Sequence, residues 1–439
     1  MRLTLAGSLF AALLSLPAHA LPGLGGCSMF PPANIWNTAI DTAPLDVNSD
    51  AYVATIGSAG HVHPDFGTVY NGAPNGIPYV LVPGGQPSVA ITFQYNSESD
   101  PGPYPIPPDA PIEGGPSSNG DRHVLIVDTG HCKLYEIYNA RPQADGTWHG
   151  GSGAVWDLNS NALRPSTWTS ADAAGLPILP GLVRYDEVAG GEIAHALRFT
   201  APQTRNTFVW PGRHQASSLT DVQYPPMGQR FRLKAAFDIS SYSAAMKVIL
   251  RALKKYGMLL ADNGSSWFIS GAPDPRWDDN DLHTLQQISG DSFEAVDETA
   301  LQVGANSGLA VQPAPPPPLP APPAGATYDI DGDGHYDALT DGVLIVRYLL
   351  GMRGPDLVQG AIGANATRNA EEIETYLGTL GAALDVDGNH VADALTDGLI
   401  IMRRLFGLNG MPLISVAIGV NATRTTPEAV AAYVDGFIQ

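Results

Sequence analysis

The sequence predicts a large β-rich domain, a sandwich-like α+β arrangement with at least one packed helix, followed by a small all-α domain. Three observations support this prediction. Short apolar runs bounded by Gly, Pro and Asn recur between residues 21 and 311, and a proline-rich segment at 312–326 follows them. From 327 to 439, acidic loops and helical stretches recur after 56 positions, from Asp329 to Asp385. We therefore expect two domains joined by a linker.

Residues 1–20 have the pattern of a secretory signal peptide. Arg2 opens a short basic start, an apolar run follows, and residues 17–20 end on the small side chains that suit cleavage. The run is too short to span a bilayer, and no other stretch of the chain is long and apolar enough. We therefore predict a secreted or cell-surface protein without a membrane span. In that oxidising compartment Cys27 and Cys132, the two cysteines, are expected to form a disulfide rather than remain thiols.

Composition restricts the class of partner. Hydrophobic residues make up 44% of the 439 residues, which is enough for a packed core. The formal net charge is -20 and no cluster of Lys and Arg occurs, which argues against a nucleic-acid partner. The 48 Gly and 38 Pro residues indicate many turns, as in a β-rich secreted domain.

The first domain is expected to contain short strands and one clear helix. The segment 240–256 places apolar residues on one side of a helix and lysines and arginines on the other, and Asp238 or Ser240 is expected to cap its start. Its apolar positions are Met246, Ile249, Leu250 and Leu253. The expected strands are 79–82, 88–95, 123–128, 134–139, 197–200, 258–261 and 266–270.

The segment 312–326 is expected to be an extended spacer. Proline lacks the amide donor and fixes φ, so the run cannot form a helix or a central strand. A polyproline II conformation satisfies both restrictions without internal hydrogen bonds.

Two acidic loops in the second domain place oxygen-bearing side chains at alternate positions, and each runs into an apolar helical segment, 343–350 or 399–406. Calcium prefers hard oxygen ligands, and an EF-hand loop presents them in this way. Gly334 and His390 occupy the sixth position, where the backbone must turn with positive φ. The expected ligands of the first loop are Asp329, Asp331, Asp333, the His335 carbonyl, Asp337 and Asp341. Those of the second are Asp385, Asp387, Asn389, the Val391 carbonyl, Asp393 and Asp397.

The region 327–439 resembles the dockerin type I module and its bacterial EF-hand-like relatives, on the Asp-x-Asp-x-Asp-Gly pattern and its helix-linked repeat. The resemblance implies two bound Ca²⁺ ions. Three features depart from the family. The closing acid stands at position thirteen, and the two loops are far apart for a compact dockerin. The recognition positions of the family fall on the apolar pairs 338–339 and 394–395. A cohesin-type partner is therefore not favoured.

Dockerin-like modules are usually attached to enzymes that degrade polysaccharides, so the resemblance implies a polysaccharide or cell-surface glycan as partner. Hydrolysis of O-glycosidic bonds normally uses paired carboxylates. Glu192, Asp262 and the segment 274–279 supply acids in the first domain, but the expected catalytic group combines two acids and two histidines near predicted strands. Its members are Glu113, Asp121, His123 and His195.

Two alternatives remain open. The first is a non-catalytic glycan-binding or cell-surface protein that stacks sugar rings on aromatic side chains. The second is a metal-dependent hydrolase in which His61, His63 and Asp65 share a metal, since residues two apart on a strand point to the same side. The tryptophans available for stacking are Trp156, Trp168, Trp210, Trp267 and Trp277.

Overall fold

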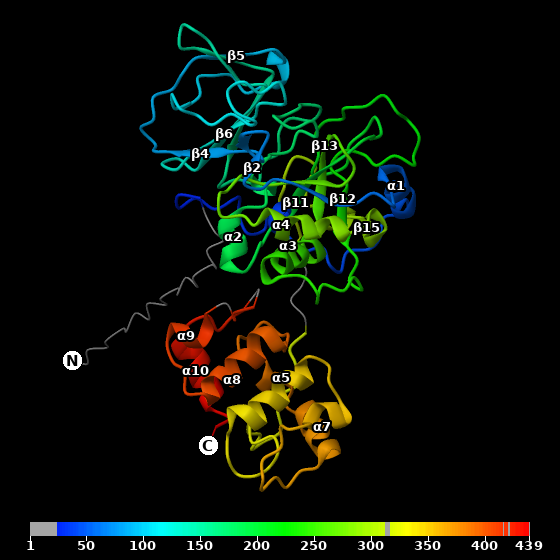
Figure 1. Ribbon diagram of the computed structural model, residues 1–439, viewed down its shortest axis with the longest axis vertical. Coiled ribbons are helices and arrows are strands. Elements are labelled where there is room, and N and C mark those ends of the chain that lie inside the picture. The colour runs from blue at the N-terminus through cyan, green and yellow to red at the C-terminus, as the bar shows by residue number, and fades with distance from the viewer. Residues whose placement is uncertain (1–23, 312–316, 416, 420–421, 439) are drawn as a thin grey trace, which may run out of the picture. The chain divides into compact units, whose positions relative to one another are not determined.

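The computed structural model describes residues 24–311, 317–415, 417–419 and 422–438 (Figure 1). The chain divides into two compact units, Met1–Gln312 and Pro313–Gln439, which are considered separately. The expected signal peptide lies outside the described residues. Within the described part, no helix has the length and apolar character needed to cross a membrane.

The described part of the first unit is mixed α/β, with short helices and many short strands. Its helices are α1 (Ser49–Ile56), α2 (Tyr185–Gly190), α3 (Ala244–Lys255) and α4 (Asp279–Leu282). Its strands are β1 (His63–Asp65), β2 (Val69–Tyr70), β3 (Ala73–Pro74), β4 (Tyr79–Val82), β5 (Ile91–Phe93), β6 (Val124–Asp128), β7 (Lys133–Tyr138), β8 (Arg141–Pro142), β9 (Trp148–Gly150), β10 (Ser152–Asp157), β11 (Leu197–Ala201), β12 (Arg230–Leu233), β13 (Met258–Asn263), β14 (Phe268–Ser270) and β15 (Phe293–Val296).

The described strands are divided among separate sheets of six, four, three and two strands, rather than the two sheets of a sandwich. The largest has the order β1-β14-β11-β13-β12-β15, and the next has the order β10-β7-β6-β4. In the six-stranded sheet, β11 runs parallel to β13 and antiparallel to β14, while β1 runs parallel to β14. The prediction of a β-rich unit is confirmed in this coarser, mixed α/β form.

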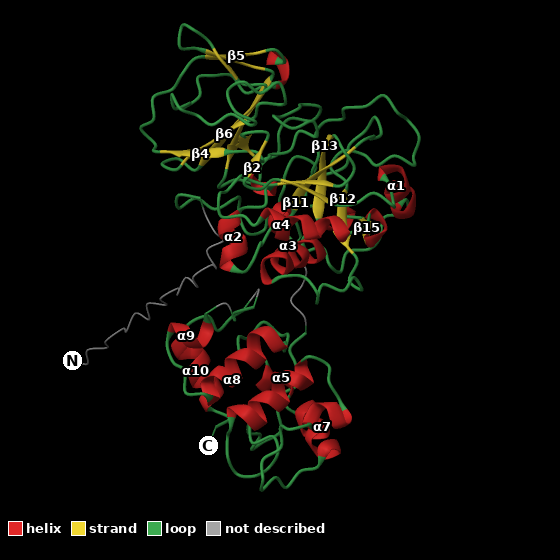
Figure 2. Cartoon of the chain, in the orientation of Figure 1, coloured by secondary structure: helices red, strands yellow, loops and turns green. Residues whose placement is uncertain are grey.

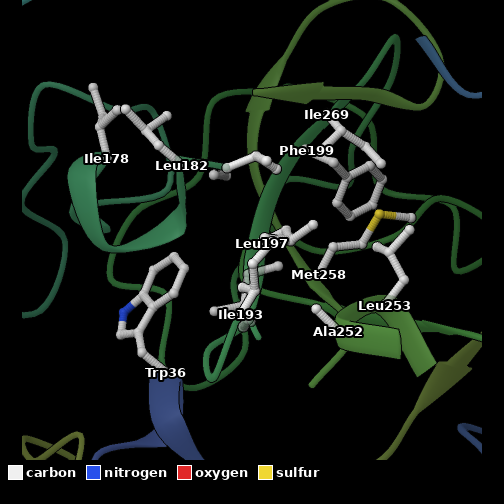
Figure 3. Packing of buried hydrophobic residues seen from close by; sticks show 14 of the residues in the cluster. Trp36, Ile178, Leu182, Ile193, Leu197, Phe199, Ala252, Leu253, Met258 and Ile269 are labelled. Carbon is white, nitrogen blue, oxygen red and sulfur yellow. The ribbon is translucent and has the colours of Figure 1, made fainter. Parts of the chain in front are cut away.

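One face of the six-stranded sheet is apolar. Leu197 and Phe199 of β11 and Met258 of β13 are fully buried in one core with Leu253 of α3 (Figure 3). Successive side chains of a strand point to opposite faces of its sheet, so Arg198 points away from this core. The arrangement leaves the second face of the sheet available to polar groups.

Helix α3 follows the prediction closely, and its four predicted apolar positions are buried. Its start differs from the prediction. Ser243 is the N-cap, and its Oγ accepts a hydrogen bond of 3.1 Å from the N–H of Met246. Asp238 instead accepts a hydrogen bond of 2.8 Å from the N–H of Ser240, within the turn that precedes the helix. The helix therefore begins later than expected, because this turn uses the earlier capping side chains locally.

The disulfide between Cys27 and Cys132 is present, with an S–S distance of 2.04 Å. It confirms the predicted pairing and joins the first described residues to the turn between β6 and β7. A disulfide of this kind fits a protein that folds in an oxidising compartment.

The described part of the second unit is helical and contains no strand (Figure 2). Leu344 and Ile345 of the first repeat share one buried core with Ile400 and Ile401 of the second, as the repeat predicts. Its helices are α5 (Val343–Leu349), α6 (Gly354–Val358), α7 (Ala370–Thr379), α8 (Leu399–Leu405), α9 (Met411–Ile414) and α10 (Pro427–Asp435).

Candidate functional site

Polar side chains from four neighbouring strands meet on the second face of the six-stranded sheet. Asp65 of β1 and Ser270 of β14 are paired in register, so both point to the same face. The Oγ of Ser270 accepts a hydrogen bond of 2.5 Å from Nη1 of Arg198 on β11. Oδ2 of Asp262 on β13 lies 3.7 Å from Nη2 of Arg198. We name these four residues the polar row.

A β-bulge brings Asp262 into the polar row. The register of β11 and β13 pairs Phe199 with Leu260 but Thr200 with Asp262, so Ala261 is one extra residue. In a regular strand without a bulge, Asp262 would share the apolar face with Leu260, since residues two apart point to the same face. The bulge places the carboxyl group on the face of Arg198.

Arg198 is buried at the centre of the row and forms a bidentate ion pair with Asp172. The two bonds, from Nε to Oδ2 and from Nη2 to Oδ1, measure 2.6 and 2.7 Å. Burial alone would lower the pKa of Arg198, but the charge of Asp172 outweighs it and raises the pKa. The guanidinium is therefore fixed in place and permanently charged.

Replacing Arg198 by Met is expected to lower the free energy of unfolding by about 3–5 kcal/mol, because it leaves Asp172 buried without its charge partner. Chemical denaturation of the full-length protein measures this loss. Arg276→Met is the control, since Arg276 is half exposed and pairs with Asp274 and Asp186 at the surface, where solvent screening makes the loss of an ion pair small. Equal losses in the two variants would show that the prediction is wrong.

Asp262 is the member of the row suited to carry a proton. Its side chain is about a quarter exposed, at 26%. Burial, and then the charge of Asp172, raise the pKa of Asp262 to about 7, although Arg198 acts in the opposite direction. Near neutral pH this carboxyl group therefore exists in both the protonated and the ionised form.

Glu113 and His123 form an ion pair beside the polar row. Nδ1 of His123 lies 2.7 Å from Oε2 of Glu113, and Nε2 lies 3.1 Å from the carbonyl oxygen of Ala171. Both ring nitrogens face acceptors, so the ring is a doubly protonated imidazolium. Burial acts to lower the pKa of His123, but Glu113 raises it to about 9. Conversely, burial acts to raise the pKa of Glu113, but His123 lowers it.

Electrostatic interactions connect this pair to the row. The charge of Glu113 acts on both Asp65 and Arg198, and that of His123 acts on Asp262. Asp65 is exposed, yet burial raises its pKa in spite of the opposing charge of His63. The charge of Arg198 therefore acts on Asp65, Glu113 and Asp262, which are each at least partly open to solvent, while its guanidinium is paired with the buried Asp172.

The predicted catalytic residues are only partly brought together. Glu113 and His123 are in contact, and the charge of Asp121, which is exposed, acts on His123. His195 belongs to another network: it is buried, with Nε2 3.2 Å from Glu187. Its Nδ1 lies 2.8 Å from the carbonyl oxygen of Ala196. Sequence position could not reveal this division, since the partners of His195 and of His123 are set by the fold.

Two further predictions lose support from the geometry. Trp156, Trp267 and Trp277 are buried in the core of the first unit, so their faces are not available to a sugar, whereas Trp168 and Trp210 are half-buried. Among the described residues, potential metal ligands come within 4.8 Å of one another in groups of three or more only in the second unit. His61, His63 and Asp65 form no such group, and the ring of His63 instead stacks on Phe268 at 4.1 Å.

The acidic loops of the second unit do gather carboxylates. The groups are Asp329, Asp331 and Asp333 in the first loop, and Asp385, Asp387 and Asp397 in the second. At the sixth position, Gly334 and His390 have φ values of 84° and 71°, as predicted for that turn. Carboxylate oxygens are hard ligands, so both loops fit a divalent cation of the calcium type.

The closing acids reach the loops although they stand one position late. The segments Ala338–Gly342 and Ala394–Gly398 form π-helical turns, which accommodate one residue more than an α-turn. Asp341 is thereby turned inward and accepts hydrogen bonds from the N–H groups of Ile330 and Asp337, at 2.5 and 2.8 Å. Asp397 accepts the equivalent bonds in the second loop.

Of the predicted carboxylate ligands, Asp337, Asp341 and Asp393 are not among the gathered groups. Asp393 instead caps the π-helical turn of its repeat, because its Oδ1 accepts hydrogen bonds from the N–H groups of Leu395 and Thr396. The ninth position of the second loop therefore serves the turn that follows it.

The chain was compared with protein-family models, with curated proteins and with solved structures. None of the three comparisons finds a match. The assignment of function therefore rests on the geometry, charge and exposure of the residues described above.

Sequence reasoning did not identify Arg198 and Asp172, and it named Asp262 only as one acid among several. The signal that points to Arg198 is one arginine between the apolar residues Leu197 and Phe199 of a predicted strand. Such a charge inside a buried strand needs a partner on the same face. No local pattern marks Asp172, because it lies in a loop distant in sequence.

Proposed function

We propose that this chain is a secreted, calcium-binding glycosidase whose first unit hydrolyses O-glycosidic bonds in a polysaccharide. The observation that carries this proposal is a pair of partly exposed carboxyl groups with different partners: Asp262 lies 3.7 Å from Arg198, and Glu113 is ion-paired with His123 at 2.7 Å. The pKa of Asp262 is raised to about 7, whereas that of Glu113 is lowered. At near-neutral pH one carboxyl group can donate a proton while the other is ionised, and this is the combination that glycosidic cleavage needs.

The residues take distinct roles in this proposal. Asp262 donates a proton to the glycosidic oxygen as the bond to the leaving sugar breaks. Ionised Glu113, about a quarter exposed, acts on the opposite side as a base for water or as a nucleophile at the anomeric carbon. His123 positions Glu113, and the fixed charge of Arg198 favours the ionised form of Asp262 after proton transfer.

We also propose that the second unit binds two Ca²⁺ ions. The donors are the three gathered carboxylates of each loop, which are the hard ligands that calcium prefers. A bound cation would supply positive charge that offsets the repulsion among them. Calcium-binding modules with oxygen ligands are common in extracellular proteins, and an extracellular location agrees with the disulfide of the first unit.

Release of reducing ends tests the proposed reaction. The full-length protein is incubated with polysaccharides that differ in sugar and linkage, and we expect new reducing ends from at least one of them. Glu113→Gln should abolish the release, whereas Glu192→Gln, at an exposed acid outside the cluster, should not change it. Binding of a polysaccharide without any release would instead favour the non-catalytic glycan-binding alternative.

A further inference from the structure

In each repeat of the second unit, the chain comes back to its own acidic loop. We name residues 361–368 and 417–424 the return segments; 417–419 and 422–424 of the latter are described. The N–H of Gly363 donates a hydrogen bond of 2.6 Å to Oδ2 of Asp331, and that of Gly419 donates one of 2.6 Å to Oδ2 of Asp387. Each return segment thus contacts a carboxylate that is a candidate cation ligand.

The backbone of each return segment passes so close to the loop carboxylates that only glycine fits at positions 363 and 419. A Cβ at position 363 would lie 2.5 Å from Oδ2 of Asp333 and 2.9 Å from Oδ2 of Asp331. A Cβ at position 419 would lie 2.8 Å from Oδ2 of Asp387. Any side chain there would displace the carboxylates, so glycine is the residue that lets the backbone reach them.

The arginine that ends each return segment binds the backbone at the start of its loop. Nη1 of Arg368 donates to the carbonyl oxygens of Asp329 and Ile330, at 2.5 and 3.0 Å. In the second repeat, Nε of Arg424 donates to the carbonyl oxygen of Val386 at 2.6 Å, and its Nη2 donates to that of Asp385. The same loop positions are therefore bound in both repeats.

The preceding threonine makes a further bond to the loop in each repeat. Oγ1 of Thr367 donates to the carbonyl oxygen of Gly332 at 2.7 Å, and Oγ1 of Thr423 donates to that of Gly388 at 3.0 Å. These glycines lie between the gathered carboxylates of their loops. The return segment thus restrains the loop backbone at several points rather than one.

An aromatic ring holds each arginine in this orientation. The guanidinium of Arg368 lies 4.0 Å from the ring centre of Tyr376 in α7, and that of Arg424 lies 3.8 Å from that of Tyr433 in α10. The tyrosines are not at equivalent positions, since the 56-residue spacing from Tyr376 leads to Ala432. Both repeats nevertheless contain the contact, which indicates that the orientation of the arginine matters.

We infer that Arg368 and Arg424 are positioning residues for cation binding, each for the loop of its own repeat. This inference rests on the proposed binding of calcium by the second unit. The arginine contributes to binding through shape, because it holds the first loop positions where the carboxylates converge. Its positive charge acts in the opposite direction, since it repels a cation.

Calorimetric titration of Ca²⁺ into the full-length protein tests the inference. The wild type is expected to bind two ions. Arg368→Met is expected to weaken one site about 10–100-fold and leave the other unchanged, and Arg424→Met is expected to weaken the other site. Arg353→Met is the matched control, because Arg353 also lies over a tyrosine, at 3.9 Å from the ring centre of Tyr348, but donates to carbonyl oxygens outside the loops.

The direction of the change in calcium affinity shows whether the arginine acts by restraining the loop backbone or by its positive charge. If charge alone mattered, removing the arginine would strengthen binding, so unchanged or tighter binding in Arg368→Met and Arg424→Met would overturn the inference. Arg368→Lys, which retains the charge without the planar guanidinium, is expected to bind calcium more weakly than the wild type. Circular dichroism at saturating calcium shows whether each variant is folded, and the Lys variant at the same position, Arg368→Lys or Arg424→Lys, replaces a Met variant that is not. Absence of calcium binding by the wild type would instead refute the proposed function of this unit.

Discussion

Replacing Asp262 by Asn is expected to lower kcat for polysaccharide hydrolysis by about 10²–10⁴-fold. Asparagine retains the size of the side chain next to Arg198 but cannot donate the proton of a carboxylic acid. In the wild type the acid works only while protonated, so activity should fall as the pH rises through about 7, the raised pKa of Asp262. The variant should lose this alkaline limb, which a pH–rate profile measures.

The acidic limb of the same pH–rate profile tests the proposed role of Glu113 as an ionised carboxylate. Its pKa is lowered, so it remains ionised below the ordinary value for glutamate and activity should persist into mildly acidic solution. Asp145→Asn, in an exposed turn, is the control and should retain the wild-type profile. Full activity of Asp262→Asn with the alkaline limb intact would contradict the assignment of the acid.

Removal of calcium is expected to unfold the second unit at a much lower temperature while the first unit melts as before. Each loop brings three carboxylates together, and without a cation their repulsion opposes folding. Calcium at 100-fold above its Kd contributes about 2.7 kcal/mol at each site. For two sites this is a large share of the roughly 5–15 kcal/mol by which a domain is stable. Calorimetry with and without a chelator measures the shift.

A variant that cannot bind calcium provides the control. Asp331→Asn combined with Asp387→Asn removes one gathered carboxylate from each loop. Its melting should no longer respond to the chelator, and the transition of the first unit should be unchanged. A second unit of the wild type that melts at one temperature in both solutions would contradict the prediction.

Local sequence patterns predicted many elements of the fold. Strand β4 begins and ends where its short apolar run does, and α7 and α10 begin where the sequence predicts a second helical stretch in each repeat, at 370–380 and 427–438. Some strands that were not predicted, such as β1 and β8, are two or three residues long. Runs of this length are too short for periodicity to appear, so only pairing with a neighbouring strand defines them. Strand β10, with six residues, and strands β12 and β15, with four each, were also not predicted.

The acidic loops were predictable because their ligands are adjacent in sequence. Alternate oxygen side chains, a sixth position with positive φ and a following helix are all local features, and the repeat shows them twice. The late closing acids were the exception. Only the π-helical turns before α5 and α8 show how Asp341 and Asp397 reach the loops.

The amino-acid sequence by itself determined the proline-rich boundary, the disulfide partners, the helix α3 and the two acidic loops, since each depends on local pattern or on a single possible pairing. The tertiary structure alone decided the polar row. Arg198, Asp172 and Asp262 lie far apart in the chain, and a one-residue bulge determines the face on which Asp262 lies. Their altered pKa values arise from burial and from charges that only folding brings together.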